Sequence, residues 1–197
     1  MRCIIQHENC NVFAVILIGT WLVPSIEAKD TIRDKSPDGK FALQITKEDE
    51  GWAAAIINLK SKENVVGLDI YQNFTEDAHL VWSNDSQRVA FFEPDRRGGS
   101  TTVYFRKGSG FEEVSLLEVD FPDCQEKPSE QDSNDKYLKT IEATTSPVKW
   151  LATGELVIEQ HSESAMESGA TRDCGQTITI AFDSAHKVSV KSAKRHG

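Results

Sequence analysis

Apolar side chains recur at every second residue along most of the chain beyond residue 29. Alternate side chains of a β-strand point to opposite faces of a sheet, whereas a helix needs apolar residues three or four positions apart. The pattern is clearest at 41–45, 52–56, 89–91, 103–105 and 178–182. The segments between are rich in Gly, Asp, Asn, Ser and Pro, the residues that form tight turns. The sequence therefore predicts an all-β fold, an antiparallel meander of short strands.

A turn sequence recurs at an offset of 47 residues. The first copy occupies 36–40 and the second 83–87, and each leads into an apolar strand; a weaker third copy begins at residue 150. Such self-similarity is typical of folds built from repeated strand units. The residues that carry the repeat are Ser36, Pro37, Asp38, Gly39, Trp82, Ser83, Asn84, Asp85, Ser86 and Trp150.

These turns and the strands after them resemble the repeats of TolB-type, WD-like β-propellers. In that family an Asp-Gly turn joins the first strand of a blade to the second, and a period of roughly 40–45 residues marks one four-stranded blade. In the second copy Asn84 replaces the family's usual proline and Ser86 its glycine. The resemblance implies about three propeller-like sheets.

Three sheets are too few to close a ring, because propellers have roughly four to eight blades. The sheets can form an open wedge or a collapsed sandwich, several chains can complete a ring, or one sheet can curl on itself. The last strand and its tail carry Lys187, Lys191, Lys194 and Arg195, and such charges discourage edge-to-edge pairing. We therefore favour an open, single-chain arrangement and expect a monomer.

The amino terminus has the pattern of a secretory signal. Arg2 precedes an apolar run at 12–23, and a short stretch ending in Ala28 offers a cleavage site. The run makes a helix of only about 18 Å, too short for a bilayer core of about 30 Å. We expect a signal peptide at 1–28, export to the periplasm or outside the cell, and no transmembrane segment in the mature chain. The remaining residues, 29–197, are expected to form one domain with inserted loops near 121–137 and 162–175.

Cleavage would remove two of the four cysteines and leave Cys124 and Cys174. In an oxidising compartment these two are expected to form a disulfide, which would close a loop of about fifty residues and contribute about 4 kcal/mol. The alternative is two unpaired thiols.

No residue pattern points to a catalytic centre, a metal or a cofactor. H-E-x-x-H and G-x-S-x-G are absent, and the acidic stretch near residue 132 lacks the glycine and final glutamate of a calcium loop. His79 lies in a predicted strand, where a hydrogen-bonded structural role is favoured. A net charge of −9 disfavours nucleic acid as a partner.

Two groups of residues are candidate binding features. The first is a cationic, glycine-rich hairpin tip able to hold an anion, although a soluble turn is the simpler interpretation. The second is the tryptophans, which could line a carbohydrate or peptide groove, but the equivalent repeat positions of Trp82 and Trp150 favour packing between sheets. The hairpin tip consists of Arg96, Arg97, Gly98 and Gly99.

The sequence favours an exported, noncatalytic module that binds an unknown protein or envelope component. The alternative is a small secreted carbohydrate- or ester-acting hydrolase with a pair of carboxylates such as Glu93 and Asp95. Paired carboxylates in a deep cleft would favour the enzyme, and a flat or convex surface would favour the interaction module.

Overall fold

A computed structural model describes residues 30–71, 74–116 and 136–196. The predicted signal peptide, most of the predicted loop at 121–137 and Cys124 lie outside these residues. The signal peptide, the Cys124–Cys174 disulfide and the single domain at 29–197 therefore stay predictions.

The described residues fold into twelve strands and no helix. The all-β prediction is confirmed. The strands are β1 (Thr31–Arg33), β2 (Phe41–Glu48), β3 (Gly51–Asn58), β4 (Asn64–Leu68), β5 (His79–Trp82), β6 (Arg88–Asp95), β7 (Gly98–Lys107), β8 (Gly110–Val114), β9 (Tyr137–Trp150), β10 (Leu156–Met166), β11 (Thr171–Phe182) and β12 (Val188–Arg195).

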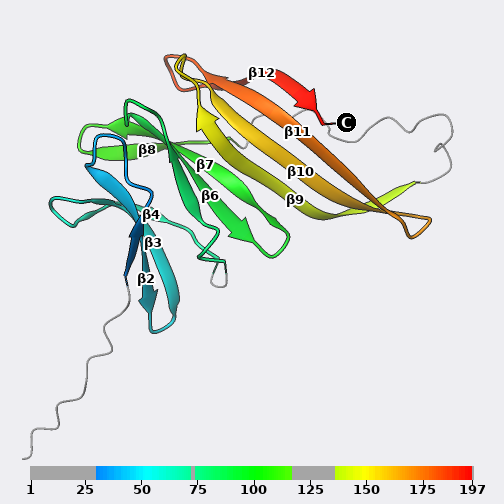
Figure 1. The fold of residues 1–197 in the computed structure, drawn as a ribbon, viewed down its shortest axis with the longest axis horizontal. Coiled ribbons are helices and arrows are strands. Elements are labelled where there is room, and N and C mark those ends of the chain that lie inside the picture. Colours follow the sequence, from blue (N-terminus) through cyan, green and yellow to red (C-terminus); the bar gives the residue numbers. More distant parts are fainter. Residues whose placement is uncertain (1–29, 72–73, 117–135, 197) are drawn as a thin grey trace, which may run out of the picture.

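The strands form three antiparallel meanders of four, β1–β4, β5–β8 and β9–β12, which follow one another across the molecule (Figure 1). Each repeated turn joins the first strand of a meander to the second. A short parallel pairing, Gly98 with Ala143 and Gly99 with Thr144, links the second and third meanders into one eight-stranded sheet. Hydrogen bonding thus yields two sheets where three were expected, and neither closes into a barrel within the described residues.

Two hydrophobic cores lie on either side of the middle meander. Successive residues of β6 point to opposite faces, so Val89 and Phe91 enter the first core while Ala90 enters the second. The first core also contains Phe41, Leu43, Ile45, Ile56 and Leu80. The second also contains Val103, Trp150, Leu156, Ile158, Ile178 and Ile180. The middle meander is therefore buried on both faces.

The outward faces of the first and third meanders each carry a polar residue where the middle meander has a phenylalanine. The three meanders can be aligned on the backbone hydrogen bonds that close their repeated turns. In this alignment Gln44 of the first meander matches Phe91 of the middle one, and Glu159 of the third matches Phe92. Gln44 is half-buried, and the Glu159 carboxylate accepts a hydrogen bond from Thr177 at 2.8 Å. Polar outer faces let the ends of a stack of sheets meet water.

The segment predicted as an inserted loop, 162–175, is instead the end of the long β10–β11 hairpin. Ser162 pairs with Cys174 and Ser164 with Arg172, and the strands turn around Gly169, whose φ is 86°. The prediction was wrong because these strands carry polar residues on both faces, so they lack the alternation that marks a half-buried strand.

Candidate functional site

The two clear copies of the repeated turn have the same hydrogen bonds. In the first, the Ser36 hydroxyl donates to Asp38 at 2.7 Å and accepts from the Phe41 amide at 3.0 Å. In the second, the Ser83 hydroxyl lies 2.6 Å from Asp85, and it accepts from the amide of the first β6 residue at 2.9 Å. Ser and Asp thus define each turn locally, through side chains that bond the backbone beside them.

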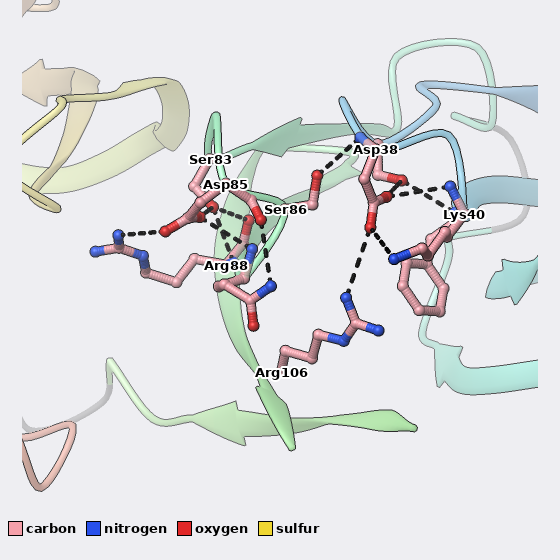
Figure 2. A network of polar contacts seen from close by, with 10 residues as sticks. Asp38, Lys40, Ser83, Asp85, Ser86, Arg88 and Arg106 are labelled. Carbon is pink, nitrogen blue, oxygen red and sulfur yellow. Dashed lines mark hydrogen bonds and ion pairs between the residues drawn. The ribbon is translucent and has the colours of Figure 1, made fainter. Parts of the chain in front are cut away.

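In the second copy Ser86 occupies the position of Gly39, and its side chain joins the two turns. Gly39 has a φ of 68° and Ser86 a φ of 58°, so both adopt the left-handed conformation. Ser86 is fully buried, and its hydroxyl accepts a hydrogen bond from the Asp38 amide at 3.0 Å. Figure 2 shows this bond between the neighbouring turns. The serine therefore replaces glycine at the cost of backbone strain but with the gain of a buried contact.

Two arginines extend the network to all three meanders. Arg106 lies 3.6 Å from Asp38, and Arg88 lies 3.2 Å from Asp85 (Figure 2). Arg88 also donates to the Gly154 carbonyl of the third turn at 2.9 Å. Partial burial opposes ionisation of both aspartates, but serine and backbone hydrogen bonds outweigh it and lower their pKa values. These groups are engaged with one another, which indicates a structural role.

The two repeated tryptophans also link neighbouring meanders. Trp82 Nε1 donates to the Asp34 carbonyl at 2.7 Å, and Trp150 Nε1 donates to the Val81 carbonyl at 2.9 Å. Each indole thus reaches the backbone of the preceding meander and packs against its core. The favoured interpretation, packing between sheets, is confirmed for both.

A pocket of about 350 Å³ lies at the β6–β7 hairpin. The Arg96 guanidinium stacks over the Tyr71 ring at 5.6 Å, and the Arg97 amide donates to Asp95 at 2.6 Å. The pocket is lined by Tyr71, Glu93, Asp95, Arg96, Arg97 and Ser100. It brings the predicted arginines together with the two carboxylates named for the alternative enzyme.

The two glycines of the predicted binding loop have a different role. A Cβ on Gly98 would lie 2.0 Å from the Ala143 carbonyl oxygen, and one on Gly99 would lie 2.6 Å from the Phe92 ring. Their backbone forms the parallel pairing with β9, where the Ala143 amide donates a hydrogen bond to the Arg97 backbone carbonyl at 2.8 Å. Close strand approach therefore accounts for both glycines, and the binding loop at 96–99 stays a prediction.

Two residues of this pocket, Tyr71 and Ser100, are not among the predicted site residues. Ser100 pairs directly with Glu93 across the hairpin, so the predicted strand pairing would have found it. Tyr71 follows β4 in a loop and reaches the hairpin only in three dimensions, and no sequence signal marks it.

The carboxylates of the pocket carry like charges. Burial raises the pKa of Glu93, and the neighbouring Asp69 and Asp95 raise it further. Glu93 and Asp95 are two positions apart and therefore lie on the same face of β6. The pocket that they line is open to solvent rather than a deep cleft. No group of three or more His, Cys, Asp or Glu side chains is arranged to hold a metal in the described part of the chain.

One stretch of β9 is exposed along its whole length, residues 137–143, which we call the β9 ledge. Tyr137 is 46% exposed, Leu138 56% and Ile141 37%. Register shifts against β10 leave Leu138 and Ile141 without a partner, so each sits in a β-bulge. Bulges redirect side chains, and here they coincide with aliphatic residues that belong to neither core.

The remaining sequence candidates have ordinary structural roles. His79 hydrogen-bonds the Asp77 carbonyl at 2.8 Å and packs against Phe92, as the sequence predicts.

No helix able to cross a membrane occurs among residues 30–71, 74–116 and 136–196.

Comparison with known proteins gives only a weak likeness in fold. No protein-family model matches the chain, and no curated protein matches it. Among solved structures, the crystal structure of TolB from Acinetobacter baumannii aligns with 84% of this chain at 11% identity and a TM-score of 0.34. The chain spans 41% of the length of that structure.

Proposed function

We propose that this chain is an exported, noncatalytic interaction module that binds a protein partner, an envelope component, through the β9 ledge. Export is supported by the signal pattern at 1–28. The observation that carries the binding role is the exposure of Tyr137, Leu138 and Ile141 on one strand segment outside both cores. Aromatic and aliphatic side chains gathered at a surface are typical of protein interfaces.

The bulges indicate how such a partner binds. A regular edge strand presents backbone donors and acceptors at every second residue, and another strand can add to it. Two bulges within the ledge interrupt that spacing. The partner therefore makes its contacts with the side chains of Leu138 and Ile141 rather than with a continuous backbone ladder.

The charged residues of the ledge fit a protein partner. Lys139 and Glu142 flank the apolar residues, and both are exposed. An apolar centre with charges of both signs at its border matches the organisation of transient protein interfaces.

The test is affinity capture from the native envelope fraction with three proteins. We expect the wild type to retain a defined partner. The double variant Leu138→Asp/Ile141→Asp should retain at least tenfold less of that partner. Val148→Asp is the matched control, because Val148 is also bulged, also on β9 and 45% exposed, but lies outside the ledge.

The control should retain the partner at the wild-type level. Equal capture by wild type and double variant, with both variants folded by circular dichroism, would show that the ledge is not the binding surface.

A further inference from the structure

We propose that the pocket at the β6–β7 hairpin binds a neutral, polyhydroxylated ligand of the saccharide class. This inference goes beyond the proposed function, because the pocket and the β9 ledge are separate groups of residues. The volume of about 350 Å³ lies at the lower end of the range of small-ligand pockets, roughly 300–1,000 Å³, and suits one or two sugar rings.

The lining supplies both kinds of hydrogen-bonding group. Arg96 and Arg97 have only donors, ionised Glu93 and Asp95 have only acceptors, and the Ser100 hydroxyl is both. A sugar hydroxyl also donates and accepts. A ligand with several hydroxyls can therefore satisfy the two walls of the pocket at once.

Several of these groups are available to a ligand. Within the described residues, the guanidinium of Arg97 and the hydroxyl of Ser100 form no hydrogen bond or ion pair. The Arg96 guanidinium lies over the Tyr71 ring and, within the described residues, forms no hydrogen bond or ion pair, so its N–H groups remain free to donate. The pocket thus holds donors that no neighbouring protein group uses.

The charges of the lining disfavour a ligand of a single sign. An anion would meet Glu93 and Asp95 beside the arginines, and Asp69 adds to the negative field around Glu93. A cation would meet Arg96 and Arg97. A neutral ligand avoids both repulsions and still accepts charge-assisted hydrogen bonds.

Tyr71 supplies the remaining part of the site. Its ring is 40% exposed, and Arg96 holds it at the pocket. An aromatic ring with an exposed apolar surface and a polar tip suits a sugar, whose C–H groups lie on one face and whose hydroxyls lie at its edge. Tyr71 therefore supplies the stacking surface and the hairpin supplies the hydrogen bonds.

The experiment is isothermal titration of the full chain with the neutral tetrasaccharides cellotetraose, maltotetraose and chitotetraose, and with the anionic tetragalacturonate. We expect at least one neutral probe to bind with a dissociation constant below about 1 mM. Tyr71→Ala and Arg97→Ala should each weaken that binding at least tenfold, whereas Tyr71→Phe should retain it. Val148→Ala, which truncates an exposed side chain outside both the pocket and the β9 ledge, should leave it unchanged.

Absence of binding by all three neutral probes, or binding of tetragalacturonate alone, would overturn the proposal. Binding that Tyr71→Ala and Arg97→Ala leave intact would also overturn it, provided that thermal melts show both variants folded. Because the ledge variants do not touch the pocket, failure here would leave the proposed protein-binding role standing, and the reverse also holds.

Discussion

Ser86 adopts an unfavourable backbone conformation and in return makes a hydrogen bond with a distant part of the chain. It adopts a left-handed conformation that favours glycine, and its buried hydroxyl accepts the Asp38 amide of the neighbouring turn. Ser86→Ala keeps the strain and leaves the amide without its partner, so we expect a loss of about 1–3 kcal/mol in the free energy of unfolding. Ser86→Gly also loses the bond but relieves the strain, and should lie between Ser86→Ala and wild type.

Urea unfolding of the three proteins measures both effects. Asn84→Ala, at an exposed position of the same turn, is the matched control and should change the free energy little. An alanine variant as stable as wild type would show that the hydroxyl between the turns contributes nothing.

Glu155 makes stability depend on pH. Hydrogen bonds from Lys191, first, and from Thr153 lower its pKa from 4.5 to about 2. A carboxylate whose pKa is lower in the folded state than in the unfolded state stabilises the fold at pH values above the unfolded-state pKa. That contribution is lost as the pH falls from about 4.5 towards 2. Glu155→Gln should therefore be less stable than wild type at pH 7, and the difference should shrink between pH 4.5 and 2.

Unfolding free energies at pH 7, 4 and 3 test this expectation. The control is Glu142→Gln, which replaces an exposed carboxylate on β9. Parallel pH profiles of Glu155→Gln and wild type would contradict the assigned role of the ion pair with Lys191.

At the scale of the strands, the features that could be predicted from the sequence are those encoded by neighbouring residues. The turns at 36–40 and 83–87 form where predicted, because their Ser and Asp side chains bond each other and accept hydrogen bonds from backbone amides within five residues. The alternation of apolar residues likewise predicts strands such as β2 and β6, since each has at least one face in a core.

The features that could not be predicted depend on residues far apart in the chain. Gly98 and Gly99 look like a flexible hairpin tip, but their role depends on β9, which begins at Tyr137. The candidate pocket could be predicted in part: its two arginines and its two carboxylates are local to the hairpin, whereas Tyr71 joins them only through folding.

At the scale of the whole molecule, the three meanders differ in what their faces meet. The middle one carries Val89 and Phe91 on one face and Ala90 on the other, and all three are buried. At the two ends of the stack, Gln44 and Glu159 occupy the positions that bulky apolar residues fill in the middle meander. A polar residue at each of these positions disfavours stacking of a further sheet there, which fits an open stack within one chain.

Reversing this polarity should make the ends associate. The double variant Gln44→Phe/Glu159→Phe places the aromatic residues of the middle meander on both outer faces, and complementary apolar ends on one molecule allow head-to-tail contacts. We expect wild type to sediment as a monomer at micromolar concentrations and the double variant to form concentration-dependent oligomers with an unchanged far-ultraviolet circular dichroism spectrum. The single variants are the controls and should associate less, because each offers only one modified end. If wild type itself assembles, and Gln44→Lys or Glu159→Lys disperses it, the outer faces are interfaces between copies of this chain and the open stack is completed by assembly.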